Sequence, residues 1–183
     1  GLRPVDGEDF LAVIDSNLGF NKTNLFVTQR IDYRVAREGA GLVATVTLTY
    51  DHTAPAAPDL VCERIPEYGA TYEDMGRRCY WDYLRVYAPG GSELIEARGL
   101  NDAATEPGER GTTTFTGDFT LRPGEQQVVT LRYRLPASVA RAPYRLLARK
   151  QAGTAANPLT VTGGACREET ALARDVRFEC DEF

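Results

Sequence analysis

The chain has 183 residues, of which 43% are hydrophobic and 26% charged, and its formal net charge at pH 7 is −5. These values are typical of a soluble globular protein, and the acidic balance argues against the basic face that nucleic-acid binding requires. No run of residues approaches the roughly 18 consecutive apolar positions of a membrane-spanning helix, so we expect no membrane insertion by this part of the protein.

Alternating apolar and polar residues predict β-strands in the first half of the chain. In chain order these are Phe10–Ile14, Leu25–Val35, Leu42–Tyr50 and Tyr80–Tyr87. Gly39, Ala40 and Gly41 between two of them indicate a hairpin turn. One segment breaks the pattern, because Thr71 followed by acidic residues predicts the N-terminus of a short helix that reaches about Met75.

The second half continues the period-two pattern. The predicted strands are Leu94–Ala97, Thr112–Leu121, Val128–Leu135, Arg145–Arg149, Leu159–Thr162 and Val176–Cys180. Pro123 and Gly124 occupy the central positions of a type II turn between two of these strands. Strands that recur at intervals of roughly ten residues indicate a sandwich or a barrel.

The predicted fold class is therefore all-β. We expect an antiparallel β-sandwich, immunoglobulin-like or jelly-roll-like, with about seven to ten strands and one short helix near Thr71–Arg77. Residues 10–183 are expected to form a single domain, and residues 1–9 an N-terminal linker or a remnant of cloning. Because the chain starts at Gly1 and its only methionine is Met75, we expect it to be part of a longer protein.

The four cysteines predict two disulfides. They are Cys62, Cys79, Cys166 and Cys180. No C-x-x-C pair is present for zinc, and the even number with two short spacings favours Cys62–Cys79 and Cys166–Cys180. Such bridges imply an oxidising compartment outside the cytoplasm. Four buried free thiols in a cytosolic protein are the alternative.

No set of residues predicts catalysis, a metal site or a cofactor. His52 is the only histidine and follows Asp51, but no serine lies in a G-x-S-x-G turn, so we expect a solvated loop histidine. Asp6, Glu8 and Asp9 lie close together without matching a calcium-binding loop, and we expect a solvated terminal segment there.

The weak candidate site is the polar segment between the first two strands, together with one tryptophan. Its members are Asp15, Asn17, Asn21, Lys22, Asn24 and Trp81. Asn and Asp favour turns, so a loop of purely structural importance is one interpretation. The other is a contact surface for a ligand or for a preceding domain. Trp81 belongs to an aromatic strand that either packs in the core or stacks on sugar rings.

Three stretches carry a resemblance to a known family. They are Phe10–Asn17 with Asn21–Asn24, Arg78–Tyr87, and Tyr144–Leu147 with Lys150–Gly153. The chain resembles the C-terminal region of large bacterial envelope proteins in the domain-of-unknown-function family number 4012. The resemblance implies a membrane anchor and a larger domain that precede this region. It implies no known reaction.

Together, these observations predict an extracytoplasmic module of a bacterial cell-envelope protein, with a non-catalytic interaction or structural role. The expected partners are the upstream domain of the same protein, an envelope glycan or another envelope protein, and tethering to the membrane is expected through an upstream segment. The alternative is a hydrolase or carbohydrate-active module that acts on a cell-wall polysaccharide. A cleft with several perturbed carboxyl groups would favour that alternative.

Overall fold

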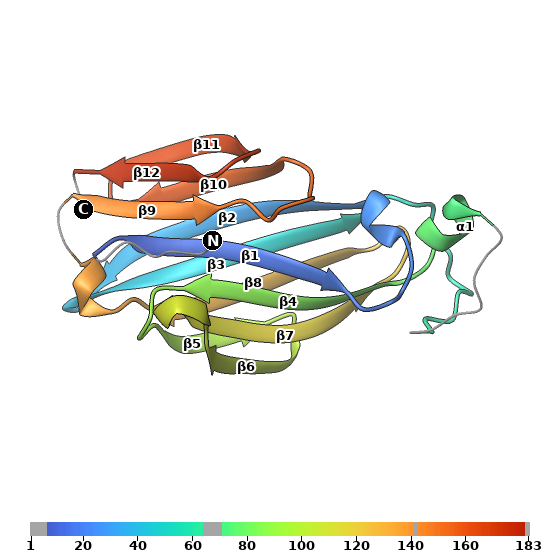
Figure 1. Cartoon of the computed structure of the whole chain (residues 1–183), viewed down its shortest axis with the longest axis horizontal. Coiled ribbons are helices and arrows are strands. Elements are labelled where there is room, and N and C mark those ends of the chain that lie inside the picture. The colour runs from blue at the N-terminus through green and yellow to red at the C-terminus, as the bar shows by residue number, and fades with distance from the viewer. Residues whose placement is uncertain (1–6, 64–70, 141–142, 182–183) are drawn as a thin grey trace.

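The computed structural model describes residues 7–63, 71–140 and 143–181, which form two six-stranded β-sheets packed face to face (Figure 1). Sheet A has the order β12 (Val176–Cys180), β9 (Tyr144–Arg149), β1 (Asp9–Asn17), β4 (Tyr80–Ala88), β7 (Thr113–Leu121) and β6 (Asn101–Pro107). Sheet B has the order β11 (Cys166–Leu172), β10 (Asn157–Gly163), β2 (Val27–Glu38), β3 (Gly41–His52), β8 (Gln126–Arg134) and β5 (Glu93–Arg98). The predicted all-β sandwich is confirmed.

The core lies between the two sheets, and the alternation of side chains explains why. In β3, for example, Ala44, Val46 and Leu48 are fully buried, whereas Thr45 and Thr47 are only partly covered on the opposite face. Successive side chains of a strand point to opposite faces of its sheet, so every second residue reaches the core. The other side of each sheet faces outward, but on sheet A that side carries a second, small buried cluster of Phe10, Ala12, Tyr87 and Leu147.

The strand pairing differs from the prediction in two respects. Most neighbours are antiparallel, as expected, but β1 pairs in parallel with β9, and β2 in parallel with β10. The described part of the chain also has twelve strands, more than the sequence predicted. β6 and β11 were not predicted, because their sequences are largely polar and most of their residues are exposed. Such edge strands lack the apolar alternation that a buried face imposes.

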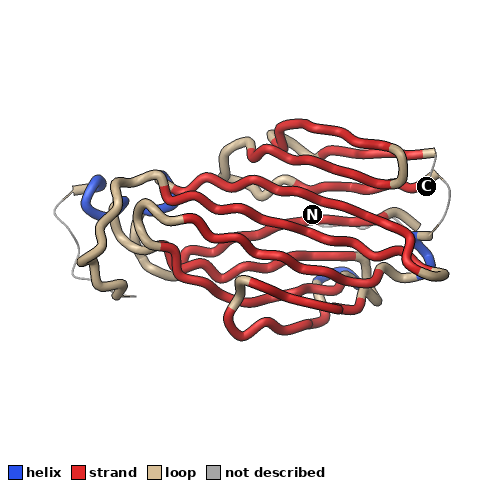
Figure 2. Tube along the Cα trace, turned by 180° about the vertical axis from the view of Figure 1, so that it is seen from behind, coloured by secondary structure: helices blue, strands red, loops and turns tan. Residues whose placement is uncertain are grey.

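Short helical segments are confined to the loops, as the view from behind shows (Figure 2). The predicted helix is confirmed as α1 (Tyr72–Gly76), and the Thr71 hydroxyl accepts a hydrogen bond from the backbone N–H of Asp74. Three 3-10 turns are η1 (Thr23–Leu25), η2 (Glu109–Gly111) and η3 (Ala137–Val139). Within the described ranges, no helix has the length and apolarity needed to cross a membrane.

Both predicted disulfides are present. Cys62–Cys79 joins the segment after β3 to the residue before β4, and Cys166–Cys180 joins β11 to β12. Cys166–Cys180 joins a strand of sheet B to a strand of sheet A, and Cys62–Cys79 ties the irregular segment after β3 to the start of β4 in sheet A. The two disulfides indicate an oxidising, extracytoplasmic environment.

Candidate functional site

The polar loop after β1 is held together by its own side chains. The Asn17 amide nitrogen lies 2.8 Å from Asn21 Oδ1 and 2.8 Å from Asn24 Oδ1. Asn17 Oδ1 accepts from the backbone N–H of Gly19 at 2.9 Å, and the buried Thr23 hydroxyl also contacts Asn21 Oδ1. The structure thus brings the three predicted asparagines together, but it uses their amides to shape the loop.

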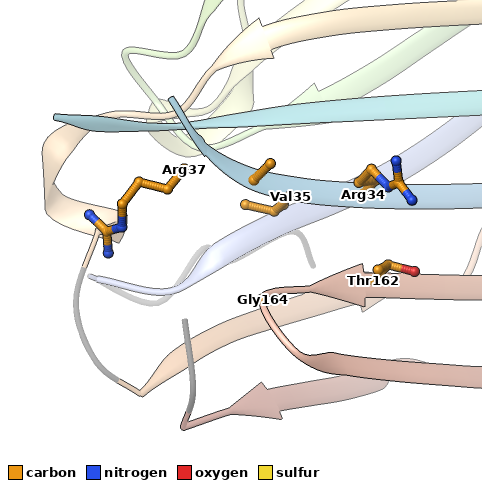
Figure 3. A pocket seen from close by; sticks show the side chains of 6 residues that line it. Arg34, Val35, Arg37, Thr162 and Gly164 are labelled. Carbon is orange, nitrogen blue, oxygen red and sulfur yellow. The ribbon is translucent and has the colours of Figure 1, made fainter. Parts of the chain in front are cut away.

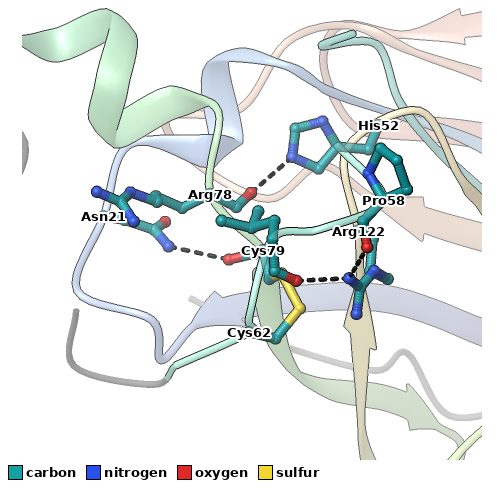
Figure 4. The surroundings of a disulfide bond; sticks show 8 residues. Asn21, His52, Pro58, Cys62, Arg78, Cys79 and Arg122 are labelled. Carbon is teal, nitrogen blue, oxygen red and sulfur yellow. Dashed lines mark hydrogen bonds between the residues drawn. A yellow bond between two sulfur atoms is a disulfide. The ribbon is translucent and has the colours of Figure 1, made fainter. Parts of the chain in front are cut away.

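The same loop is fixed to the first disulfide (Figure 4). Asn21 Nδ2 donates to the backbone carbonyl of Cys79 at 2.9 Å, and the backbone N–H of Lys22 donates to the carbonyl of Met75. Gly76 is needed there, because a Cβ at that position would lie 2.2 Å from the Phe26 ring. The loop, α1 and the disulfide therefore form one connected unit, which we call the disulfide end.

His52 belongs to this unit, and the expectation of a solvated loop histidine is wrong. Its side chain is buried at the end of β3. Nδ1 accepts from the backbone N–H of Ala54 at 3.4 Å, so Nε2 carries the proton and donates to the Arg78 carbonyl at 2.9 Å. Burial lowers the pKa of His52, since desolvation disfavours the imidazolium. Both ring nitrogens are occupied, and the residue is structural.

Large apolar side chains are exposed at the disulfide end. Four of the six that are exposed in the described part of the chain belong to it, namely Phe20, Leu25, Val61 and Tyr72. Phe20 is 65% exposed and has a φ of 50°. A positive φ is rare for a bulky residue and costs on the order of 1–3 kcal/mol, so the surrounding structure must impose it. The loop holds the Phe20 ring in solvent against its backbone preference.

Trp81 lies beside this loop on the outer face of sheet A. The backbone N–H of Leu18 donates to the Trp81 carbonyl at 2.7 Å, and a Cβ at Gly19 would lie 3.1 Å from Trp81 Cδ1. The ring is half-buried, and its Nε1 has no hydrogen-bond partner among the described residues. A cavity of about 140 Å³ is lined there by Leu18, Trp81, Asp82, Tyr83 and Asp118. Trp81 therefore lies against the start of the loop at Leu18 and Gly19, next in sequence to Phe20.

Asp15 does not face that surface; it belongs to a polar network that crosses the core. Tyr50 Oη donates to Asp15 Oδ1 at 2.6 Å, and Gln29 Nε2 donates to Asp15 Oδ2 at 2.9 Å. Asp82 Oδ1 accepts from the backbone N–H of Ser16 and from the Tyr80 hydroxyl. The network therefore connects β1 and β4 of sheet A to β2 and β3 of sheet B.

Burial raises the pKa values of both carboxyl groups of this network. Asp82 Oδ2 is buried and accepts no hydrogen bond from the described residues. Burial, reinforced by repulsion from Asp15, raises the pKa of Asp82 to about 9, and burial also raises the pKa of Asp15. Asp82 is therefore protonated at neutral pH and can donate to Asp15.

A second buried carboxylate was expected to be solvated, and that expectation is wrong. Asp9 is fully buried at the start of β1. Its Oδ2 accepts from the Tyr33 and Tyr144 hydroxyls at 2.5 Å, and its Oδ1 accepts from the Phe10 N–H. Desolvation outweighs these bonds and raises the pKa of Asp9 to about 6. Glu8 pairs with Arg177, and Asp6 lies outside the described residues.

The outer face of sheet B carries a polar hollow that sequence reasoning missed (Figure 3). Two shallow pockets of about 310 and 290 Å³ adjoin there and share Arg34 and Thr162. The alternation of threonine and charged residues in β2 and β3 was visible in the sequence. On its own the alternation predicts only β-strands, because the pairing of β2 with β10 cannot be known from the sequence.

Comparison with known proteins gives no further identification. No family model, no curated protein and no solved structure matches the chain. The resemblance to the envelope family stays a prediction. The fold and the two disulfides define the protein as an extracytoplasmic all-β sandwich.

Proposed function

We propose that this chain is a non-catalytic interaction module of a bacterial cell-envelope protein, and that it packs on the preceding domain of the same protein. The proposed contact is the Phe20 surface, which comprises Phe20, Leu25 and Trp81. The observation that carries the proposal is the exposure of Phe20 and Leu25 on a loop that is rigidly held. Exposed apolar patches on soluble proteins commonly mark interaction sites.

The rigidity of the loop favours binding. The asparagine network and the Cys62–Cys79 bridge fix the loop before any partner arrives. A contact made by a preorganised surface loses less conformational entropy than one made by a mobile loop. Trp81 adds a large, half-buried ring, although its indole N–H is itself buried. Aromatic residues are enriched at interfaces.

The path of β1 decides how a preceding domain reaches this surface. β1 begins at Asp9, at the end of the sandwich away from the disulfide end, and spans nine residues (Figure 1). At about 3.3 Å per residue, the strand covers roughly 30 Å, which is within the dimensions of one domain. A preceding domain that lies along the outer face of sheet A therefore reaches Trp81 and then Phe20.

The hydrolase alternative is less well supported. Its strongest support is the pair of perturbed carboxyl groups, Asp15 and Asp82. These groups interact directly, whereas the two carboxyls of a glycosidase stand about 5 Å or more apart to flank the scissile bond. Their hydrogen-bond partners are core side chains such as Tyr50 and Gln29, and Asp15 lines none of the described cavities.

The experiment compares Phe20→Asn with Ile95→Thr as a matched control. Asn tolerates a positive φ, so the first variant removes the ring without adding strain. Ile95 is also exposed but lies on β5 of sheet B. Binding to the separately produced preceding region is measured by calorimetry. We expect Phe20→Asn to weaken binding by roughly tenfold or more and the control to leave it unchanged. Equal affinity of both variants, or no binding by the unchanged chain, contradicts the proposal.

A further inference from the structure

The outer face of sheet B arranges arginine and threonine in rows across its strands. Strand register places Thr162 opposite Arg167 on one side and Arg34 on the other, and Arg34 in turn is opposite Thr45. The row continues to Arg132 in β8. The row therefore presents an arginine guanidinium on every second strand, with a threonine hydroxyl between each pair. Neighbouring strands are about 4.8 Å apart.

The next row along the strands is rich in hydroxyl groups. Thr160 is opposite Asp32, Asp32 is opposite Thr47, and Thr47 is opposite Thr130. Within the described structure, no hydrogen bond engages the hydroxyls of the four threonines that line the pocket of about 290 Å³: Thr45, Thr47, Thr160 and Thr162. They are free to donate to a ligand and to accept from it.

The two rows enclose the adjoining pockets described above. Their volumes, about 310 and 290 Å³, approach those of small-ligand sites, and they share Arg34 and Thr162. Figure 3 shows Arg34 and Thr162 on neighbouring strands, with Arg37 and Gly164 toward the end of the hollow. We call this hollow, from Arg167 to Thr47 and Arg37, the Arg34 site.

The charge of the Arg34 site is positive, although the whole chain is acidic. Among the described residues, neither Arg34 nor Arg37 has an ion-pair partner, whereas Arg167 is paired with Glu169. Among the described residues, Asp32 is the only acidic residue in the lining of the two pockets, and Glu169, which lies opposite Thr160, is paired with Arg167. A free guanidinium presents donors that match the two oxygens of a carboxylate or phosphate.

The shape of the site selects an extended ligand rich in hydroxyl groups. Tyr33 belongs to the lining, but its side chain is buried in the core, where its hydroxyl donates to Asp9. Among the described lining residues, the remaining apolar ones are Val35 and Ala36 at one end, which form no deep apolar pocket for the side chains of a peptide. Threonine hydroxyls and the Asp32 carboxylate can instead bond the hydroxyls of a sugar. We propose that the Arg34 site binds an anionic glycan, with Arg34 on the acidic group and the threonines on the neighbouring hydroxyls. This site is separate from the Phe20 surface, so either can fail without the other.

The test measures binding of three probes by calorimetry or by shifts in nuclear magnetic resonance spectra. The probes are an oligogalacturonate, a poly(glycerol phosphate) oligomer and a neutral glucan of equal length. We expect the chain to bind at least one anionic probe, and added salt to weaken that binding. A preference between the two anionic probes identifies the acidic group as carboxylate or phosphate. Failure of both anionic probes to bind, or equal binding of the neutral glucan, overturns the proposal.

Variants locate the site. Arg34→Gln should weaken binding of the anionic probe by roughly tenfold or more, because it removes a charge-assisted contact. Arg145→Gln, an exposed arginine on β9 of sheet A, is the matched control and should change affinity less than twofold. The melting temperature of Arg34→Gln should equal that of the unchanged chain. Equal losses in the two variants indicate diffuse charge attraction, and tight binding of poly-glutamate indicates an acidic peptide; both contradict a glycan site.

Discussion

The buried carboxyl group of Asp9 gives the most quantitative prediction. Three hydrogen bonds favour its ionised form, and complete burial disfavours it; desolvation is the larger effect, so the pKa rises to about 6. An unfolded chain releases this proton near pH 3.9. Between these two values the folded state binds more protons than the unfolded state, so the contribution of Asp9 to stability falls as pH rises.

The variant Asp9→Asn isolates this contribution, because it removes the titration and keeps the shape of the side chain. A pKa difference of about two units corresponds to about 3 kcal/mol. Raising the pH from about 4 to about 7.5 should therefore shift the difference in unfolding free energy between the two proteins by about 2–3 kcal/mol in favour of the variant.

Urea denaturation of both proteins across this pH range measures the shift. Other titrating groups, including Asp82 and His52, are present in both proteins and cancel in the difference. A difference that does not change with pH would show that Asp9 titrates as it does in the unfolded chain. A shift in favour of the unchanged protein would show that the Tyr33 and Tyr144 hydroxyls outweigh desolvation, and would refute the reasoning.

Three further predictions concern the disulfide end. Replacing Cys62 and Cys79 by serine should lower the free energy of unfolding by about 3 kcal/mol in urea denaturation, since the bridge closes a loop of 17 residues; an unchanged value would contradict its structural role. Asn21→Ala should cost about 1–3 kcal/mol by leaving the buried Cys79 carbonyl without its donor, whereas Lys22→Glu should cost less than about 0.5 kcal/mol; equal melting temperatures would contradict this. Neither the chain nor its His52→Ala variant should turn over esterase, peptidase or glycosidase substrates, and turnover lost in the variant would overturn the non-catalytic role.

Local patterns in the sequence predicted the elements with one buried face. In Leu42–Tyr50 every second residue is apolar, and this segment lies within β3. The disulfides were predictable because the members of each pair are 17 and 14 residues apart, which allows local pairing. The short helix was predictable because Thr71 has the chemistry of an N-cap.

Features that depend on long-range pairing could not be predicted. The burial of Asp9 requires Tyr33 from β2 and Tyr144 from β9, and no local signal distinguishes it from a solvated acid near a terminus. The Arg34 site depends on the parallel pairing of β2 with β10, which places Thr162 beside Arg34. The asparagines after β1 were recognised as unusual, but only the structure shows that their amides bond one another and the Cys79 carbonyl.

Amide hydrogen exchange in the longer protein tests the central claim most directly. Exchange rates are compared between this chain alone and the same chain joined to its preceding region. The account predicts slower exchange in the loop of residues 18–26 and at Trp81 when the preceding region is present, with no change in β5 around Ile95. Identical exchange in the loop, or protection confined to other parts of the sandwich, would contradict packing through the Phe20 surface.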